Sequence, residues 1–365
     1  MEMRAAVCRR VHAPVAIETV EVDKPAGREL LVRTVATGVC HSDLHVVDGQ
    51  SRYSLDHGIV LGHEGAGVVE AVGDEVTTVR PGDHVVACLS GFCGACAQCL
   101  SGHPNLCVGG AVARAAAAPP RLAKDGHGLW PFAGIGSYAE RMLLHENSVV
   151  RIDPDIPLDR AALVGCGVLT GVGAALRSAG LEAGQTVAVF GCGGVGLSIV
   201  QGARIGGARQ IIAVDMFESK LEMARRVGAT HVVNTTHDDP VAAVRRLTGG
   251  AGVDHAFEAV GNATLVRQAI ESLAIRGTAT IVGVLPPDAK IEFPWMAIRP
   301  ECRVQTSRMG GNRFRIDIPR YLDFYRQGRL LLDEMVTRRG RLDDLNEAFR
   351  AMKAGEVART VLTFD

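Results

Sequence analysis

The chain is short of aromatic residues, of surplus positive charge and of long apolar runs. Ten Phe, four Tyr and two Trp stand among 365 residues, whereas glycine occurs 43 times. This composition favours an α/β protein with tight turns between strands and helices. Lys and Arg total 39 against 40 Asp and Glu, for a formal net charge of -1. Nucleic-acid binding needs an excess of positive charge, so this balance argues against it.

No run of about 18 uninterrupted apolar residues occurs, so we expect no membrane span. The N-terminal "MEMRAAVCRR" also contains no apolar run. We therefore expect no signal peptide and a location in the reducing cytoplasm. In that compartment clustered cysteines bind metal more often than they form disulfides.

The pattern of the sequence changes near residue 160, and the length predicts two or three domains. Before 160, short alternating stretches predict a compact β-barrel-like domain with strands near 4–10, 15–22, 29–39, 65–73 and 83–89. After 160, strands alternate with helices, which predicts a parallel sheet with right-handed crossovers. Beyond 310 the pattern is helical and ends in a strand-like "RTVLTF".

The stretch "FGCGGVG" has the order G-x-G-x-x-G at Gly191, Gly193 and Gly196. The first glycine permits a tight turn, the second lets a pyrophosphate approach the backbone, and the third lets helix and strand pack closely. A strand precedes the turn and a helix follows it. Asp215 ends the next strand, where an acid binds the ribose hydroxyls of NAD and repels the 2′-phosphate of NADP. We expect a Rossmann domain that binds NAD.

Four cysteines lie within fifteen residues, at positions 93, 96, 99 and 107. Four thiolates complete the tetrahedral shell of a structural zinc and leave no open position. Short C-x2-C-x2-C runs also hold iron–sulfur clusters, which remain an alternative at this point.

A second set of ligands is scattered along the chain in "GVCHSDLHVVDG", "LGHEGAGVV" and "GCGVLTG". Cys40, His63 and Cys166 together offer two thiolates and one imidazole. Three protein ligands and an open fourth position describe a catalytic zinc.

These motifs, in this order, resemble the zinc-dependent medium-chain alcohol dehydrogenases, close to liver alcohol dehydrogenase and glutathione-dependent formaldehyde dehydrogenase. The resemblance covers essentially the whole chain. It implies a GroES-like β-barrel catalytic domain with a doubly wound Rossmann domain inserted in it. The expected ranges are 1-167 for the catalytic domain with its zinc lobe at 93-107, 168-308 for the Rossmann domain, and 309-365 for the return to the catalytic domain.

The resemblance implies that Cys40, His63 and Cys166 hold the catalytic zinc and that Asp43 orients His63. Ser42 would bind the hydroxyl of the alcohol, and a proton would pass from Ser42 through the cofactor ribose to His45. Glu64 would lie behind the metal and approach it during ligand exchange. Zinc would lower the pKa of the hydroxyl, and hydride would pass from the alcohol carbon to the nicotinamide.

The resemblance also implies a set of cofactor contacts. His41 and Arg359 would lie near the pyrophosphate, Thr170 near the nicotinamide, and Lys220 beside Asp215. The remaining expected cofactor residues are Gly194 and Val195 in the turn, with Val260 and Val284.

The segment between Cys107 and Cys166 is long, as in the dimeric branch of the family. We therefore expect a homodimer whose Rossmann sheets join edge to edge. The expected partner is otherwise a small alcohol or aldehyde, with no nucleic acid and no membrane.

The substrate is the least readable feature of the sequence. In the formaldehyde branch, an acid after the "DG" pair and an arginine after the last lobe cysteine bind the glutathione adduct. Ser51 and Ala111 stand at the best-matching places here, while Arg52 and Arg114 are displaced.

We therefore expect a primary or aryl alcohol, with Phe132 and Trp130 as apolar walls. Glutathione-dependent formaldehyde dehydrogenase-like activity remains an alternative. A zinc-independent quinone or enone reductase, or a non-enzymatic relative, is a further alternative.

Overall fold

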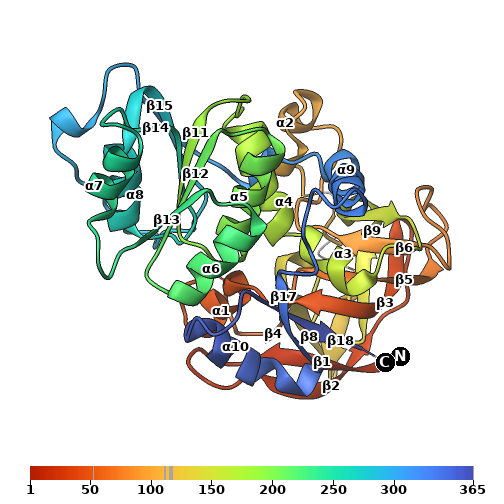
Figure 1. Ribbon diagram of the computed structural model, residues 1–365. Coiled ribbons are helices and arrows are strands. Elements are labelled where there is room, and N and C mark those ends of the chain that lie inside the picture. Colours follow the sequence, from red (N-terminus) through yellow and green to blue (C-terminus); the bar gives the residue numbers. More distant parts are fainter. Residues whose placement is uncertain (52, 111, 115–117, 365) are drawn as a thin grey trace. The chain divides into compact units, whose positions relative to one another are not determined.

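A computed structural model describes residues 1–51, 53–110, 112–114 and 118–364. The chain divides into two compact units, each described by itself below. Unit 1 comprises Met1–Cys166, Arg313–Tyr325 and Met335–Asp365, and unit 2 comprises Gly167–Asn312 and Arg326–Glu334. Unit 2 is thus inserted in the sequence of unit 1 (Figure 1).

Unit 1 contains a small closed barrel in the order β1-β2-β7-β8-β4. Its strands are Glu2–Cys8, Ala16–Val22, Leu122–Lys124, His127–Pro131 and Ile59–Val60. One side chain in two along β1 and β2 faces the barrel interior, where Met3, Ala5, Val7, Val20 and Val22 form one apolar cluster. This barrel confirms the GroES-like class expected for the N-terminal part.

A seven-stranded sheet forms the rest of unit 1, in the order β10-β6-β5-β3-β18-β17, with β9 also paired to β3. Its strands are Val149–Ile152, His84–Ala87, Gly65–Val72, Glu29–Gly38, Arg359–Thr363, Val336–Gly340 and Arg141–His145. The expected final strand is therefore an interior strand, between β3 and β17. The helices of this unit are α1 (His41–Val47), α2 (Ala97–Leu100), α3 (Leu158–Val164), α9 (Phe314–Arg326) and α10 (Leu345–Lys353).

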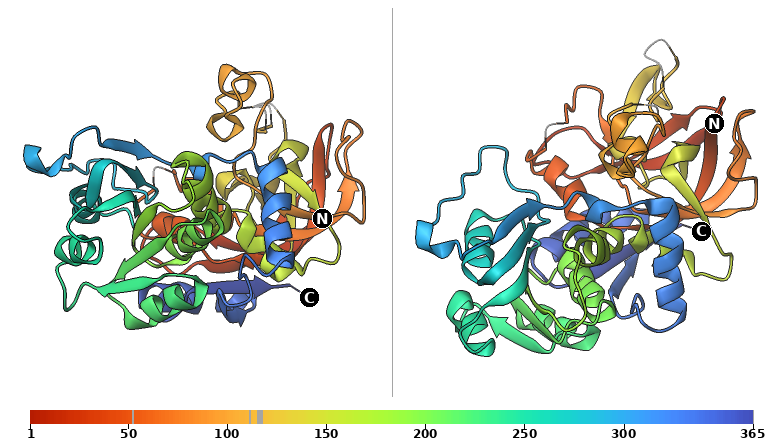
Figure 2. Two further views of the ribbon diagram at one scale, coloured as in Figure 1. Left: turned by 45° about the horizontal axis from the view of Figure 1, so that its top comes forward. Right: turned by 90° about the horizontal axis from the view of Figure 1, so that it is seen from above.

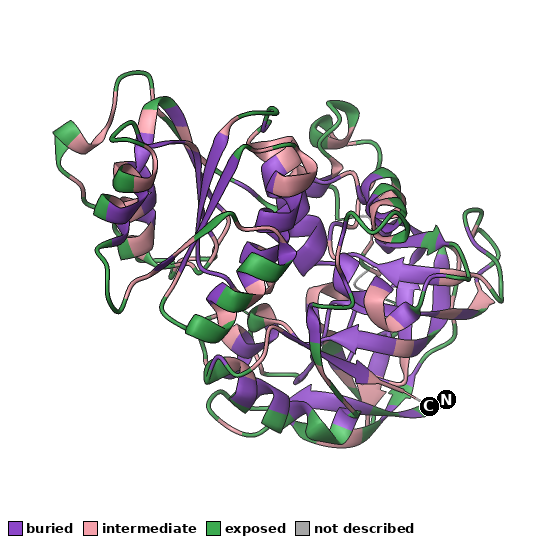
Figure 3. Cartoon of the chain, in the orientation of Figure 1, coloured by how far each residue is buried: buried purple, intermediate pink, exposed green. Residues whose placement is uncertain are grey.

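Unit 2 contains six parallel strands in the order β13-β12-β11-β14-β15-β16. They span His231–Asn234, Gln210–Asp215, Thr186–Phe190, Val253–Glu258, Leu273–Ile281 and Arg303–Thr306. The central strand β11 is buried along its whole length, as its purple colour in Figure 3 shows. This sheet confirms the expected Rossmann architecture.

Helices cover both faces of this sheet. In Figure 1, α5 (Gly194–Ile205) and α6 (Glu218–Val227) lie on one side, and α7 (Pro240–Leu247) and α8 (Ala263–Glu271) lie on the other. The short helix α4 (Gly167–Gly173) packs on α5. The chain first builds outward from β11 to β13 and then returns to β14. Ligands bind at the carboxyl ends of the strands at such a reversal, which here lies between β11 and β14.

Within the described part of the chain, no single helix has the length and apolar composition needed to cross a membrane. The short helices at 158–164 and 167–178 pass that test only when they are counted together across the bend between them.

Candidate metal centres and cofactor turn

The four lobe cysteines gather around one point, and α2 lies among them. Their Sγ atoms are separated by 3.6 Å (Cys96–Cys99), 3.9 Å (Cys93–Cys99) and 3.9 Å (Cys96–Cys107). Four thiolates around one tetrahedral zinc lie about 3.8 Å apart, because each Zn–S bond is about 2.3 Å long. A multi-iron cluster needs wider spacing, and a disulfide needs about 2 Å. The spacing therefore fits a single closed-shell ion.

Backbone amides around the lobe favour thiolates. The N–H groups of Ala95 and Cys96 donate to Cys93 Sγ at 3.4 and 3.2 Å, and they lower the pKa of that thiol. The backbone N–H groups around Cys96 lower its pKa to about 6. Figure 2 shows the lobe, drawn in orange, standing apart from the strands of unit 1.

The second cluster lies in the interior of unit 1. Cys40, His63, Glu64 and Cys166 each direct one ligand atom to a common point, and these atoms lie within 4.8 Å of one another. Cys40 directly precedes α1, His63 and Glu64 lie between β4 and β5, and Cys166 follows α3. Three segments far apart in the sequence thus converge as the scattered motifs predict.

The donor atoms of this cluster fit zinc. His63 Nε2 is fully buried and has no hydrogen-bond partner among the described residues, which is costly unless a metal ion binds it. A hydrogen bond from Cys166 holds the pKa of Cys40 well below its ordinary value, and the same contact raises the pKa of Cys166. Two sulfurs and one imidazole nitrogen in a buried site are the ligand types that zinc prefers.

Asp43 lies next to His63, and its expected role in orienting that imidazole stays a prediction. Its Oδ2 lies 3.0 Å from His63 Nδ1, and both side chains are fully buried. Burial alone would lower the pKa of His63, but the charges of Asp43 and Cys40 raise it well above its ordinary value. Gly62 N–H and the hydroxyl of Tyr138 also donate to Asp43. No local sequence pattern indicated Tyr138.

Glu64 and Arg359 form a buried ion pair beside the cluster. Burial raises the pKa of Glu64 to about 7 against the opposing charge of Arg359. Gly38 makes this pair possible, because a Cβ there would overlap the carboxylate of Glu64. Arg359 is thus largely buried rather than freely exposed for a cofactor, and its expected place at the pyrophosphate stays a prediction.

Helix α1 contains Ser42 and His45, the residues of the expected proton path, which stays a prediction. Ser42 Oγ lies 3.9 Å from Cys40 Sγ, next to the cluster. His45 follows three residues later, so it shares the same face of the helix and is only partly buried. His41, at the first position of α1, is exposed.

An aromatic wall adjoins the imidazole of His63. The ring of Phe132 lies edge-on at 5.4 Å from that of His63, and Tyr53 lies at 5.2 Å from Phe132. The other expected wall residue, Trp130, is exposed and its ring is near His57 instead.

The three glycines of the turn in unit 2 differ in what they permit. Gly191 has φ +94°, which favours glycine, and a Cβ at Gly196 would overlap the carbonyl oxygen of Gly191. At Gly193, no described atom lies within 4 Å of the place a Cβ would occupy. Helix α5 starts directly afterwards with Gly194 and Val195. The open space at a helix N-terminus fits a pyrophosphate.

Asp215 connects the end of β12 to this turn. Its Oδ2 accepts from Cys192 N–H at 2.8 Å, and its Oδ1 accepts from the backbone of Met216 and Phe217. Lys220 places its amine 4.7 Å from the centre of the Phe217 ring.

Three more of the expected cofactor residues lie in unit 2. Val260 and Val284 follow β14 and β15 at the carboxyl edge of the sheet, and both are exposed. Thr170 is buried in α4 and contacts Met309 Sδ at 3.4 Å.

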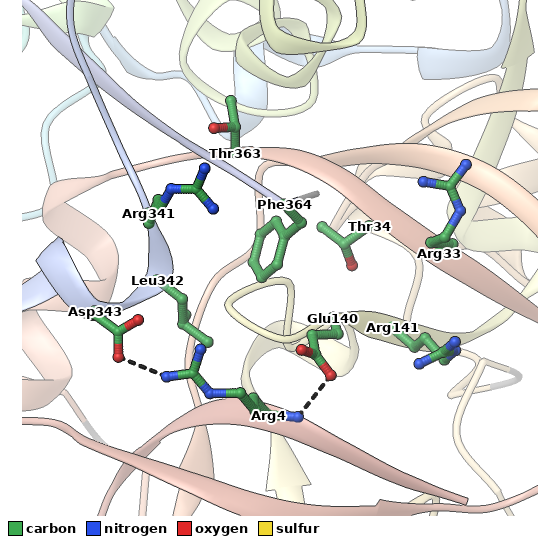
Figure 4. A pocket seen from close by; sticks show the side chains of 10 residues that line it. All are labelled: Arg4, Arg33, Thr34, Glu140, Arg141, Arg341, Leu342, Asp343, Thr363 and Phe364. Atoms are coloured by element: carbon green, nitrogen blue, oxygen red, sulfur yellow. Dashed lines mark hydrogen bonds and ion pairs between the residues drawn. The ribbon is translucent and has the colours of Figure 1, made fainter.

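A separate cavity of about 330 Å³ in unit 1 contains none of these residues (Figure 4). Four of its ten lining residues are arginines, but Arg4 is paired with Asp343 at 2.6 Å and Arg141 with Glu70 at 2.7 Å. This cavity is not a candidate metal centre, because its lining contains neither cysteine nor histidine.

The structure describes only some of the positions that correspond to the glutathione-binding residues of the formaldehyde branch. Arg52 and Ala111 lie outside the described residues. Arg114 donates to Glu29 at 2.6 Å and to Asp23 at 2.7 Å. Its guanidinium is therefore already engaged by two carboxylates.

Comparison with known proteins agrees with this architecture. Residues 26–154 match the alcohol dehydrogenase GroES-like domain, and residues 194–327 match the zinc-binding dehydrogenase domain. An S-(hydroxymethyl)glutathione dehydrogenase of Saccharomyces cerevisiae is 38% identical over 373 residues, which cover 99% of this chain and 96% of the relative. An alcohol dehydrogenase class-3 of Cereibacter sphaeroides is 36% identical, with both chains fully covered.

Among solved structures, the benzyl alcohol dehydrogenase of Acinetobacter calcoaceticus superposes with a TM-score of 0.92. It is 32% identical, and both chains are fully covered. The name of the Saccharomyces cerevisiae relative refers to a glutathione adduct, which fits the alternative expectation better than the primary or aryl alcohol expected first.

Proposed function

Because the chain belongs to the zinc-dependent medium-chain alcohol dehydrogenase family and is an oxidoreductase of that family, we propose that it transfers hydride reversibly between the carbon that bears a primary hydroxyl and NAD. The observation that carries this proposal is the buried cluster of Cys40, His63 and Cys166, with His63 Nε2 lacking any described partner. Those three residues would hold the catalytic zinc.

Zinc bound there supplies a Lewis acid, and NAD supplies the hydride acceptor. Around them the chain has distinct tasks. The hydroxyl of Ser42 accepts the proton of the substrate alcohol, and His45 on the same face of α1 passes it to solvent. Glu64 balances the charge of Arg359 and can approach the metal site when ligands exchange. Cys93, Cys96, Cys99 and Cys107 would hold the structural zinc.

NAD is proposed in preference to NADP. Support comes from Asp215, whose carboxylate ends β12 beside the glycine turn and would repel a 2′-phosphate. The neighbouring Met216 and Phe217 offer no cation for that phosphate.

The first candidate substrate is an S-(hydroxymethyl) thiol adduct, which carries a primary hydroxyl. Its support is the name S-(hydroxymethyl)glutathione dehydrogenase, which relatives at 36 to 38% identity have. The second candidate is an aryl alcohol. Two observations favour it: Phe132 stacks edge-on against His63, and Arg114 is engaged by Glu29 and Asp23.

A turnover panel with NAD separates these candidates. If the first is right, formaldehyde is oxidised only when glutathione is present, and kcat/KM exceeds that for benzyl alcohol. If benzyl alcohol is oxidised and added glutathione does not change the turnover of formaldehyde, the second candidate, an aryl alcohol, is the substrate. Rapid turnover with NADP and none with NAD would contradict the cofactor assignment.

Metal analysis tests the centre itself. We expect about two zinc ions per chain and one in Cys40→Ala, with kcat/KM lowered at least about 1000-fold because a Lewis acid contributes several kcal/mol. Cys96→Ala is the matched control: it should lose the other zinc and thermal stability while the retained zinc still supports turnover. One zinc per native chain, with unchanged activity in Cys40→Ala, would refute the proposal.

We also propose a homodimer. Strand β16 is the edge of the parallel sheet in unit 2, and the segment before it exposes large apolar side chains. Trp295 and Met296 are 80% and 83% exposed, and Val304 on β16 is 52% exposed. An unpaired edge with apolar neighbours is suited to pair with a second copy.

A further inference from the structure

Tyr138 connects to the catalytic cluster through one carboxylate. Its side chain is fully buried, and its hydroxyl lies 2.9 Å from Asp43 Oδ2. The carbonyl oxygen of Gly38 is farther from that hydroxyl, at 3.3 Å. The single hydroxyl hydrogen is therefore directed mainly to the ionised acceptor, since charged acceptors form the stronger bonds.

Asp43 is held by three groups from two separate segments, residues 62–63 and Tyr138. Gly62 N–H donates to Oδ1 at 2.7 Å, Tyr138 donates to Oδ2, and His63 Nδ1 lies 3.0 Å from the same Oδ2. The carboxylate is completely buried, so water does not replace a lost donor without rearrangement. Tyr138 and His63 thus share one oxygen, and the strength of one contact affects the other.

Burial, followed by the charge of Asp43, raises the pKa of Tyr138 well above its ordinary value. The phenol therefore keeps its proton over the working pH range and remains a donor. The aromatic ring itself packs edge-on at 6.3 Å from Phe349, independently of the hydroxyl.

We propose that Tyr138 is a positioning residue for the catalytic metal. Its hydroxyl fixes the orientation of Asp43 and draws negative charge away from the oxygen that faces His63. The inference rests on the proposed function, in that His63 must be a zinc ligand. Groups that orient a ligating histidine typically change metal affinity by about 10- to 100-fold. Tyr138 acts one bond farther away, so we expect a smaller effect.

The test is Tyr138→Phe in the full-length protein, which removes one oxygen and keeps the ring. Zinc release to 4-(2-pyridylazo)resorcinol should become about 3- to 10-fold faster for one zinc and remain unchanged for the other. The apparent pKa on the acid limb of kcat/KM should rise, because Asp43 pulls more strongly on His63 and the metal becomes a weaker acid.

Ser137→Ala is the matched control. Its hydroxyl is also buried, in the adjacent residue, but it bonds to Thr37 at 2.7 Å instead of Asp43. We expect this variant to lose some thermal stability without altering zinc release or the pH profile. Replacing Tyr138 with 3-fluorotyrosine, a stronger donor, should move the acid limb in the opposite direction, and it tests the inference even if Tyr138→Phe does not fold.

Equal zinc release and an unchanged pH profile in Tyr138→Phe and Ser137→Ala would overturn the inference and leave Tyr138 a purely structural residue. A native chain that holds only the four-cysteine zinc would instead overturn the proposed function. The two failures are therefore distinguishable by the zinc content of the native protein.

Discussion

Single buried side chains in unit 1 connect segments that no regular structure joins. Glu146 is the clearest case outside the metal sites. It is fully buried and accepts from Arg28 Nε at 2.7 Å and from Thr78 Oγ1 at 2.8 Å. Burial alone would raise the pKa of Glu146, but the hydrogen bonds from Arg28 and Thr78 lower it to about 2.

This lowered pKa predicts a pH-dependent contribution to stability. The folded-state pKa lies below the ordinary value of 4.5, so Glu146 stabilises the fold above about pH 4.5, and the contribution is lost as the pH falls toward 2. Glu146→Gln should lower the free energy of unfolding by about 1 to 3 kcal/mol at pH 7. Urea denaturation at pH 7 and pH 4 should show the difference from the native protein shrinking at pH 4.

The exposed Glu21 offers a control for that experiment, since Glu21→Gln removes the same charge outside any buried network. A deficit for Glu146→Gln that is the same at both pH values would mean that packing, and not the charge, determines the loss.

At the scale of elements, the turn between β11 and α5 contains one glycine that the fold needs and another that is free to serve cofactor binding. Gly196 is required for helix and strand to approach, whereas Gly193 has φ −75°, which any residue adopts, and free space beside it. Gly193→Ala should therefore keep the thermal midpoint of the cofactor-free protein within about 2 °C. A methyl group in the pyrophosphate space should weaken NAD binding at least about 10-fold.

Fluorescence titration with NAD and thermal unfolding without it measure both quantities on the same sample. Unchanged affinity for NAD would remove the glycine turn from the binding site. A large fall in the thermal midpoint would show that Gly193 is needed for folding.

The elements that could be predicted from sequence are those with a strong local pattern. The strand, glycine turn and helix at 186–205 and the alternation that follows it predicted the parallel sheet. Strands β4, β7 and β8 were missed because they have two, three and five residues and little alternation. They become strands only because the closed barrel supplies partners for their backbone groups.

In the candidate site, too, some features could be predicted from local sequence and others could not. Motifs predicted its ligands, because zinc restricts the residue types and their immediate neighbours. The contact between Glu64 and Arg359 spans 295 residues, and that between Asp43 and Tyr138 spans 95. The hydrophobic periodicity of the sequence does not predict such pairs, since they depend on how β3, β5 and β18 are brought together.

For the whole molecule, the edge strand β16 carries the prediction of assembly. Val304→Lys places a charge on the exposed apolar edge, which should shift the protein from dimer to monomer in light scattering. Zinc content should stay at the native value, because the metal clusters lie in unit 1. Ile275→Lys is the matched control, because it also places a charge on an exposed apolar position, but in β15. A native protein that elutes as a monomer or a tetramer would contradict the dimer.

The placement of β18 has a consequence for synthesis. Unit 1 is interrupted in the sequence, and its sheet gains the strand between β3 and β17 only from residues 359–363. Residues 1–166 leave the ribosome first, but their sheet is still incomplete at that stage. Nearly all of unit 2 is continuous and is synthesised before the last strands of unit 1, so it can fold as a unit before unit 1 does. Arg359 arrives with that same late strand. The partner that neutralises Glu64 is thus synthesised after nearly all of unit 2, and the unit that contains the candidate metal clusters is completed after the other one.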